Sequence, residues 1–82
     1  MEDTEGQDIG FSFGWALKQL WYGKKVRRES WNGKGQWLAL QIADQNSKMV
    51  RPYIYISPVD GGLVPWVASQ SDMLSADWEI AE

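Results

Sequence analysis

Aromatic, amide and cationic groups lie close together in one short segment, which runs from Arg28 to Gly35. Within it, Trp31 is followed by the amide of Asn32 and by a Gly-Lys-Gly sequence around Lys34. An indole ring can stack on a nucleobase, and glycines let a phosphate or a ribose approach the backbone amides closely. The structural alternative is a hairpin, because Asn-Gly favours a tight turn and Trp31 could pack back on the core. Both interpretations place these residues in a loop.

A second segment with similar chemistry begins at Val64-Pro65-Trp66 and ends at Asp72. Trp66 would supply another aromatic face, while Ser69, Gln70 and Asp72 would supply polar contacts, and the start of a helix can itself hold an anion. The structural alternative is a buried tryptophan beside a capped helix, since Ser69 and Asp72 have the spacing of a capping box. Two aromatic stacks together with phosphate contacts would be enough to bind a small nucleotide.

Basic residues precede the first segment, at Lys24, Lys25, Arg27 and Arg28. The whole chain has a net charge of -3, but residues 9–71 hold all eight basic residues and only three acidic ones, a net charge of +5. This region could clamp a phosphate, or it could be solvated surface near a helix end. The basic run is too short, and the whole chain too acidic, for a protein that binds long nucleic acids.

The missing residue types restrict the chemistry further. The chain has no His and no Cys, which removes the commonest general base, the thiolate nucleophile and any disulfide. The carboxylates of Asp72, Asp77 and Glu79 match the spacing of no known metal-binding loop. We therefore expect no enzyme activity, no metal and no other cofactor. Since no apolar run reaches membrane-spanning length and no secretory leader is present, we expect a cytoplasmic protein without membrane contacts.

These two segments must be held in place by helices and strands. The order of helix and strand patterns in the sequence predicts an α+β fold, with an N-terminal helix packed on a short antiparallel sheet and a second short helix. An apolar stripe predicts the first helix over residues 11–22, capped by Ser12 and ended by Gly23. Trp15 lies off this stripe, and we place it at the edge of the core, with a contact surface as the alternative. The members of the stripe are Phe13, Ala16, Leu17, Leu20 and Trp21.

Alternating apolar residues predict strands over residues 25–28, 36–43, 52–57 and 77–81, and Pro65 predicts an extended segment at 63–66. The first strand is short and basic, so we expect it at an edge of the sheet with Val26 pointing inward. In the second strand we expect Leu38, Leu40 and Ile42 to share one face. Residues 10–82 would then form one ligand-binding domain, after an acidic, disordered lead-in at residues 1–9.

The aromatic content, six Trp, three Tyr and two Phe, is large for 82 residues. A domain of this size buries only about 60–65% of the surface of its unfolded chain. Some of these rings should therefore lie at a subunit interface or in a ligand site. Association of subunits is also the expected source of stability for a small chain without disulfides.

Several motifs together resemble a small phage-encoded family, long catalogued as a domain of unknown function and now known as Thoeris anti-defence protein two. The resemblance covers about residues 11–80. Its motifs are Phe13-Gly14-x-Ala16-Leu17, Gly23-Lys24-Lys25-Val26-x-Arg28, Trp31-Asn32-Gly33-Lys34-Gly35, Pro52-Tyr53-Ile54 and Val64-Pro65-Trp66-x-x-Ser69-Gln70-x-Asp72-x-Leu74-x-x-Asp77-Trp78.

The resemblance implies a non-enzymatic sponge that inhibits bacterial anti-phage defence. Family members sequester cyclic ADP-ribose-type signals, notably glycocyclic ADP-ribose made by TIR-domain enzymes, and some bind cyclic dinucleotides at separate sites. It also implies a homotetramer with pockets at subunit interfaces, in the cytoplasm of the infected bacterial host. The alternative is a protein–protein interaction module that uses exposed aromatic residues as anchors. The ligand-binding residues implied by the matching motifs are Trp31, Asn32, Trp66, Ser69, Gln70, Asp72, Arg28 and Lys34.

Overall fold

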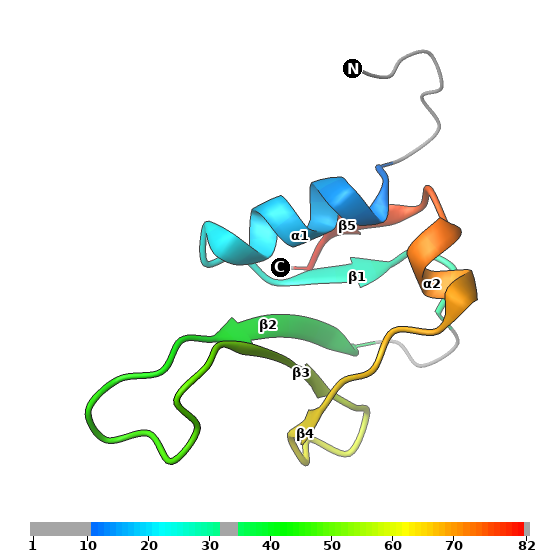
Figure 1. The fold of residues 1–82 in the computed structure, drawn as a ribbon. Coiled ribbons are helices and arrows are strands. Elements are labelled where there is room, and N and C mark those ends of the chain that lie inside the picture. Colours follow the sequence, from blue (N-terminus) through cyan, green and yellow to red (C-terminus); the bar gives the residue numbers. More distant parts are fainter. Residues whose placement is uncertain (1–10, 32–34, 82) are drawn as a thin grey trace.

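The structure is a five-stranded antiparallel sheet with one helix packed across it and a second, shorter helix beside it (Figure 1). The computed structural model describes residues 11–31 and 35–81. The predicted lead-in at residues 1–9 and the predicted turn that holds Asn32 and Lys34 lie outside the described residues. The architecture confirms the predicted α+β fold, with its helix on a short antiparallel sheet and its second short helix.

The first helix, α1, spans Phe13–Trp21 and follows the predicted apolar stripe. The Ser12 hydroxyl caps its first turn by accepting a backbone hydrogen bond at 3.1 Å. The helix ends before Gly23, whose φ of 87° is a conformation that glycine adopts without strain. Ala16 and Leu20 point at the sheet and are buried. No helix of the described residues is long and apolar enough to cross a bilayer.

Two tryptophans at the margins of this stripe behave differently from each other. Trp15 is half-buried against the core, as predicted, and stacks on Phe11 with ring centroids 4.2 Å apart. Trp21, which we expected on the buried face, has 61% of its surface exposed. Each helical residue turns by about 100°, so Trp21 is rotated by that angle from its buried neighbour Leu20 and lies at the margin of the helix–sheet contact, where it lines an open hollow instead of the closed core.

The strands lie in the order β4-β3-β2-β1-β5. Leu38 and Leu40 pack toward α1 as predicted, whereas Ile42 lies just past the end of its strand and is exposed. A polar turn at residues 44–48 follows β2 and is held by the Asp44 side chain. The bounds of the strands are β1 Val26–Arg28, β2 Trp37–Gln41, β3 Tyr53–Ser57, β4 Val64–Pro65 and β5 Trp78–Ile80.

β1 is an inner strand, so the prediction of an edge strand is wrong. Val26 points inward as expected, but it pairs with Leu38 of β2 on one side and with Ile80 of β5 on the other. The local sequence could not show this arrangement, because β5 comes from the far end of the chain. The edges are β4 and β5, and Pro65 suits the edge strand β4 because it has no N–H to donate.

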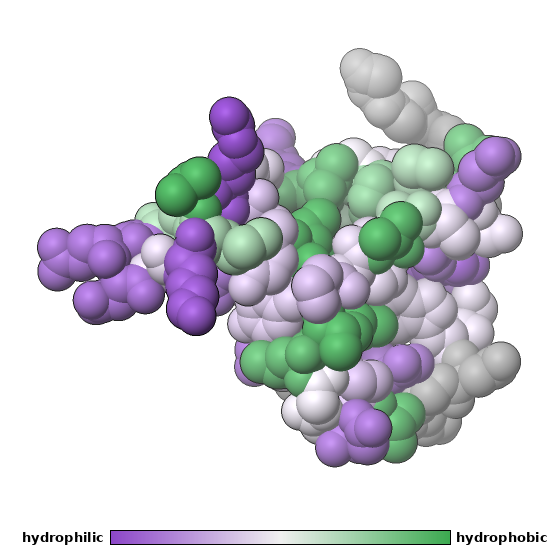
Figure 2. Space-filling view, turned by 60° about the horizontal axis from the view of Figure 1, so that its bottom comes forward, coloured by the Kyte–Doolittle hydropathy of each residue, from purple (hydrophilic) through white to green (hydrophobic). Residues whose placement is uncertain are grey.

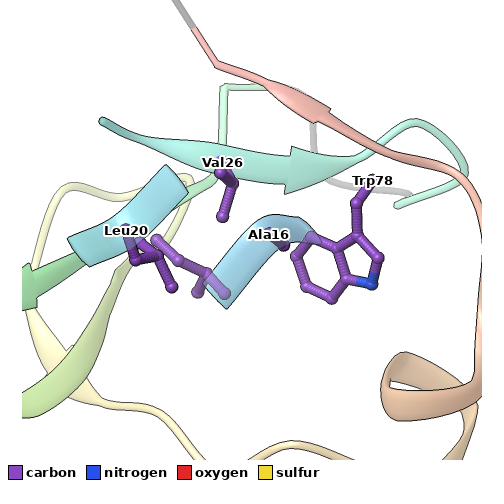
Figure 3. Packing of buried hydrophobic residues seen from close by; sticks show 5 residues of the cluster. Ala16, Leu20, Val26 and Trp78 are labelled. Carbon is purple, nitrogen blue, oxygen red and sulfur yellow. The ribbon is translucent and has the colours of Figure 1, made fainter. Parts of the chain in front are cut away.

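The core lies between α1 and the β5–β1–β2 end of the sheet (Figure 3). Trp78 is its largest side chain, and the indole N–H of Trp78 donates to the backbone oxygen of Asp72 at 3.0 Å. All aromatic residues of the chain lie within the described residues, and of these Trp78 alone is buried. The core is therefore too small for the aromatic content, as predicted. The buried cluster consists of Ala16, Leu20, Val26, Leu38 and Trp78.

The sheet face opposite α1 is aromatic and charged. Trp37 lies on the side of β2 opposite Leu38, and the Nζ atom of Lys25 lies 4.2 Å from its ring centroid. The same Trp37 ring meets Tyr55 edge-on, with centroids 6.1 Å apart.

Candidate ligand-binding site

Four of the predicted site residues meet at the carboxylate of Asp72. This residue lies in the first turn of the second helix, α2, which spans Gln70–Leu74. Its Oδ1 atom accepts hydrogen bonds from Arg28 Nη1 at 2.9 Å and from the indole N–H of Trp31 at 3.4 Å. Its Oδ2 atom accepts from the backbone and the hydroxyl of Ser69, at 3.2 and 2.9 Å. The predicted capping box is confirmed, and it also holds the Asp72 carboxylate facing Arg28 and Trp31.

Arg28 continues this network toward β5. Its Nε atom donates to Asp77 Oδ1 at 2.8 Å, and its Nη2 atom donates to the Ser30 hydroxyl at 3.1 Å. The guanidinium therefore bridges two carboxylates, one at the start of α2 and one just before β5. The three side chains are only 13–25% exposed, so water weakens these ion pairs less than it weakens pairs on an open surface.

The network keeps both carboxylates ionised at neutral pH. Burial by itself would raise the pKa of Asp72, but hydrogen bonds from Arg28 and Ser69 outweigh it and hold that pKa below its usual range. Burial would also raise the pKa of Asp77, but hydrogen bonds from Ser30 and Arg28 outweigh this effect, so the pKa of Asp77 is lowered as well. The hydrogen bonds to Asp77 and Asp72 raise the pKa of Arg28.

The two candidate tryptophans both pack edge-on against the buried ring of Trp78. Their centroids lie 5.6 Å from it for Trp31 and 6.1 Å for Trp66. The free surfaces of the two rings, however, border different hollows. Trp31 lines a hollow of about 290 Å³ together with Arg27 and Arg28, whereas Trp66 lines an apolar hollow of about 320 Å³ between α1 and β3. Among the described residues of one protomer, the two aromatic faces therefore do not enclose a single hollow.

The remaining predicted residues lie apart from this cluster or outside the described chain. Gln70 is exposed at the first position of α2, and its side chain makes no hydrogen bond to the described residues. Asn32 and Lys34 belong to residues 32–34, which are not described. The structure thus brings together Arg28, Trp31, Ser69 and Asp72, with Trp66 joined to them through Trp78.

The basic residues upstream of the loop border a third hollow, of about 580 Å³, on the sheet face opposite α1. Lys24, Lys25 and Arg27 line it, and it shares Arg27 with the hollow at Trp31. Arg27 is paired with Glu79 at 2.7 Å, whereas the ammonium group of Lys24 has no carboxylate partner among the described residues. A negatively charged group could therefore be held next to the Trp31 hollow.

Asp77 is the important residue that the sequence-based candidates omitted. Its carboxylate holds Arg28 and the backbone N–H of Ser30, so it fixes the turn from which Trp31 emerges. The sequence showed Asp77 only as the first residue of a predicted strand, as a carboxylate without a known metal-binding spacing, and as part of a motif of the resemblance. Its role depends on the register of β1 and β5, which pairs Arg28 with Trp78 and so places Asp77 beside the end of β1.

Two comparisons with known proteins relate this geometry to a family. Residues 11–81 match the sequence profile of the family described as the Thoeris anti-defense 2-like domain. A protein of Bacillus phage SP01, named Thoeris anti-defense 2, is 35% identical, and the alignment covers 84% of this chain and 92% of that protein. The match spans α1, all five strands and α2, and it includes every residue of the network around Asp72.

Proposed function

This chain belongs to the Thoeris anti-defense 2-like family, and we propose that it inhibits Thoeris defence in infected bacteria by sequestering a nucleotide signal. The ligand class is a cyclic ADP-ribose-type molecule, with glycocyclic ADP-ribose as the first candidate and cyclic dinucleotides as a second class. The protein would bind this signal and keep it intact, so that the signal no longer reaches its receptor.

The observation that carries this proposal is the fixed position of Trp31 at the border of a hollow that also contains Arg27 and Arg28. The indole N–H of Trp31 is bonded to Asp72, which limits rotation of the ring before a ligand arrives. A base stacked on the free ring surface would contribute about 1–3 kcal/mol. Lys24, whose ammonium group has no carboxylate partner among the described residues, would attract the phosphates of the same ligand.

Sequestration without cleavage agrees with the state of the acidic groups in the network. The carboxylates of Asp72 and Asp77 are both ionised and both bound to Arg28, so neither is poised to donate or accept a proton. A chain without His and Cys has few other groups for acid–base or nucleophilic chemistry. Tight binding alone would be sufficient to lower the free concentration of the signal.

A homotetramer is part of the proposal, because one protomer leaves Trp31 and Trp66 on separate hollows. Two subunits placed side by side could bring the Trp66 surface of one against the Trp31 surface of another. The exposed apolar residues support association, and Figure 2 shows several hydrophobic groups separated by polar ones on one face of the protomer. We place the ligand pockets at such subunit interfaces.

The direct test is recovery of the ligand. The protein is incubated with glycocyclic ADP-ribose, freed of unbound ligand and denatured by heat, and the released molecule is identified by chromatography and mass spectrometry. Recovery of the intact molecule is the expected result, and a cleaved product would contradict sequestration. Thermal shifts across a set of cyclic nucleotides identify the preferred ligand, because a molecule that binds only the folded state raises the melting temperature.

The second candidate function is a protein–protein interaction module. The observation in its favour is that Trp21 and Tyr22, adjacent at the end of α1, are 61% and 66% exposed. Aromatic anchors of this kind are common at protein interfaces. This function predicts no thermal shift with any cyclic nucleotide and a host protein that is captured by the wild type and lost with Trp21→Ala.

A further inference from the structure

Asp77 holds two separate parts of the turn that leads into the Trp31 loop. Its Oδ1 atom accepts from Arg28 Nε at 2.8 Å, and its Oδ2 atom accepts from the backbone N–H of Ser30 at 3.0 Å. The backbone oxygen of Asp77 also accepts from the N–H of Glu29 at 3.0 Å. One residue just before β5 therefore fixes both the main chain of the turn and the guanidinium that extends from it.

The Arg28 guanidinium passes this constraint on to Trp31. With Nε held by Asp77, its Nη1 atom lies 2.9 Å from Asp72 Oδ1, and the same oxygen receives the indole N–H of Trp31. Because a guanidinium is planar and rigid, fixing one edge orients the other. Asp77 thus acts on the orientation of the Trp31 ring through Arg28 and Asp72, and also directly through the main chain at Ser30.

Asp77 itself is not among the residues that line the Trp31 hollow, which include Arg28, Glu29 and Glu79. Both carboxylate oxygens of Asp77 already accept hydrogen bonds from the protein, Oδ1 from Arg28 and Oδ2 from Ser30. We propose that Asp77 is a positioning residue that sets the orientation of the Trp31 ring for ligand binding without touching the ligand. The part that concerns ligand rests on the proposed function, whereas the effect on the ring does not.

The test uses Asp77→Asn, which keeps the shape of the side chain. An amide presents one acceptor and one donor, so it satisfies Arg28 or Ser30 but opposes the other. The indole ¹H–¹⁵N resonances of Trp31 and Trp37 are followed in the ligand-free protein, and each is assigned from the spectrum of its own Trp→Phe variant. We expect the Trp31 resonance to shift while that of Trp37, whose ring contacts Lys25 and Tyr55 on the opposite sheet face, stays in place.

Affinity for glycocyclic ADP-ribose is the second measurement, and we expect Asp77→Asn to weaken it by roughly tenfold, as for the loss of one charge-assisted hydrogen bond. Asp44→Asn is the matched control. Asp44 also accepts from a backbone N–H and from a hydroxyl, but it lies in the turn at residues 44–48, away from Trp31. This control should leave both the Trp31 resonance and the affinity unchanged.

The outcomes separate this inference from others. An unmoved Trp31 resonance in Asp77→Asn would overturn it, as would joint movement of Trp31 and the distant Trp37, which would indicate a general structural role. If Asp77→Asn does not fold, Asp77→Glu keeps the charge, displaces the carboxylate by one methylene and must show the same selective shift. If the wild type binds no cyclic nucleotide, the proposed function fails, while the resonances still decide the role of Asp77.

Discussion

Trp31 contributes to the fold and to the candidate site with different parts of the same ring. One edge packs on Trp78, and the indole N–H reaches Asp72. The remaining surface borders the hollow with Arg27 and Arg28. The two interpretations that the sequence left open, core residue and stacking platform, are therefore compatible, and a substitution series is needed to separate them.

Trp31→Ala should abolish binding of glycocyclic ADP-ribose and lower the free energy of unfolding by about 2 kcal/mol. The cost is smaller than the 3–5 kcal/mol of a fully buried aromatic residue because the ring is only half-buried. Trp31→Phe keeps a smaller stacking ring and loses the long bond to Asp72 with part of the packing on Trp78, so its affinity should stay within about tenfold of the wild type. Calorimetric titration and urea unfolding measure both quantities. Equal loss of affinity in the two variants would show that the ring surface is not the platform.

The two carboxylates bound to Arg28 predict an acid-sensitive fold. Both Asp72 and Asp77 have pKa values below their usual range, since hydrogen bonds from the protein outweigh burial. A lowered native-state pKa stabilises the fold above the unfolded-state pKa, about 3.9 for Asp, and this stabilisation is lost as the pH falls through the native-state value. The free energy of unfolding should therefore decline below about pH 4. Urea titrations from neutral to acid pH test this, and Asp77→Asn should show a shallower decline than the wild type.

At the scale of elements, two serine caps on two helices provide a natural comparison. Ser12 caps α1 away from the network, whereas Ser69 caps α2 and also holds Asp72. Removing either hydroxyl with Ser→Ala should cost about 1 kcal/mol of stability. Only Ser69→Ala should weaken ligand binding, because only that cap orients the carboxylate that holds Trp31. Equal ligand affinities of Ser12→Ala and Ser69→Ala would show that the α2 cap does not contribute to the ligand site.

The sequence predicted elements well where the signal is local. Four such features depend only on residues a few positions apart: the stripe of α1, the Ser12 cap, the capping box at Ser69 and the strand at residues 52–57. The inner position of β1 was missed because the partner that covers it, β5, lies about fifty residues later. The same limit applies to the site. Its residue types were recognised, but the role of Asp77 depends on strand register, which local sequence does not specify.

The whole molecule has more apolar surface than one helix can cover. α1 packs over β5, β1 and β2 and leaves the β3 end of the same sheet face open. An apolar hollow of about 320 Å³ lies there, next to the exposed ring of Trp21. None of the residues that line it is charged; they are Leu17, Leu20, Trp21, Leu40, Pro52, Tyr53, Ile54 and Trp66. An uncharged hollow beside a protruding aromatic ring suits a contact with a second copy of the chain.

Subunit association should therefore stabilise this protein in a concentration-dependent way. The melting temperature should fall on dilution, because a protomer bound to a partner is stabilised by mass action. Trp21→Glu places a charge at the rim of the hollow, and desolvating that charge would oppose assembly. Analytical ultracentrifugation should show smaller species for this variant, while Lys18→Gln, which makes the same change in net charge on the exposed side of α1, should assemble like the wild type. A melting temperature independent of concentration, together with unchanged sedimentation of Trp21→Glu, would exclude this hollow as the subunit interface and leave Trp66 without a partner subunit there.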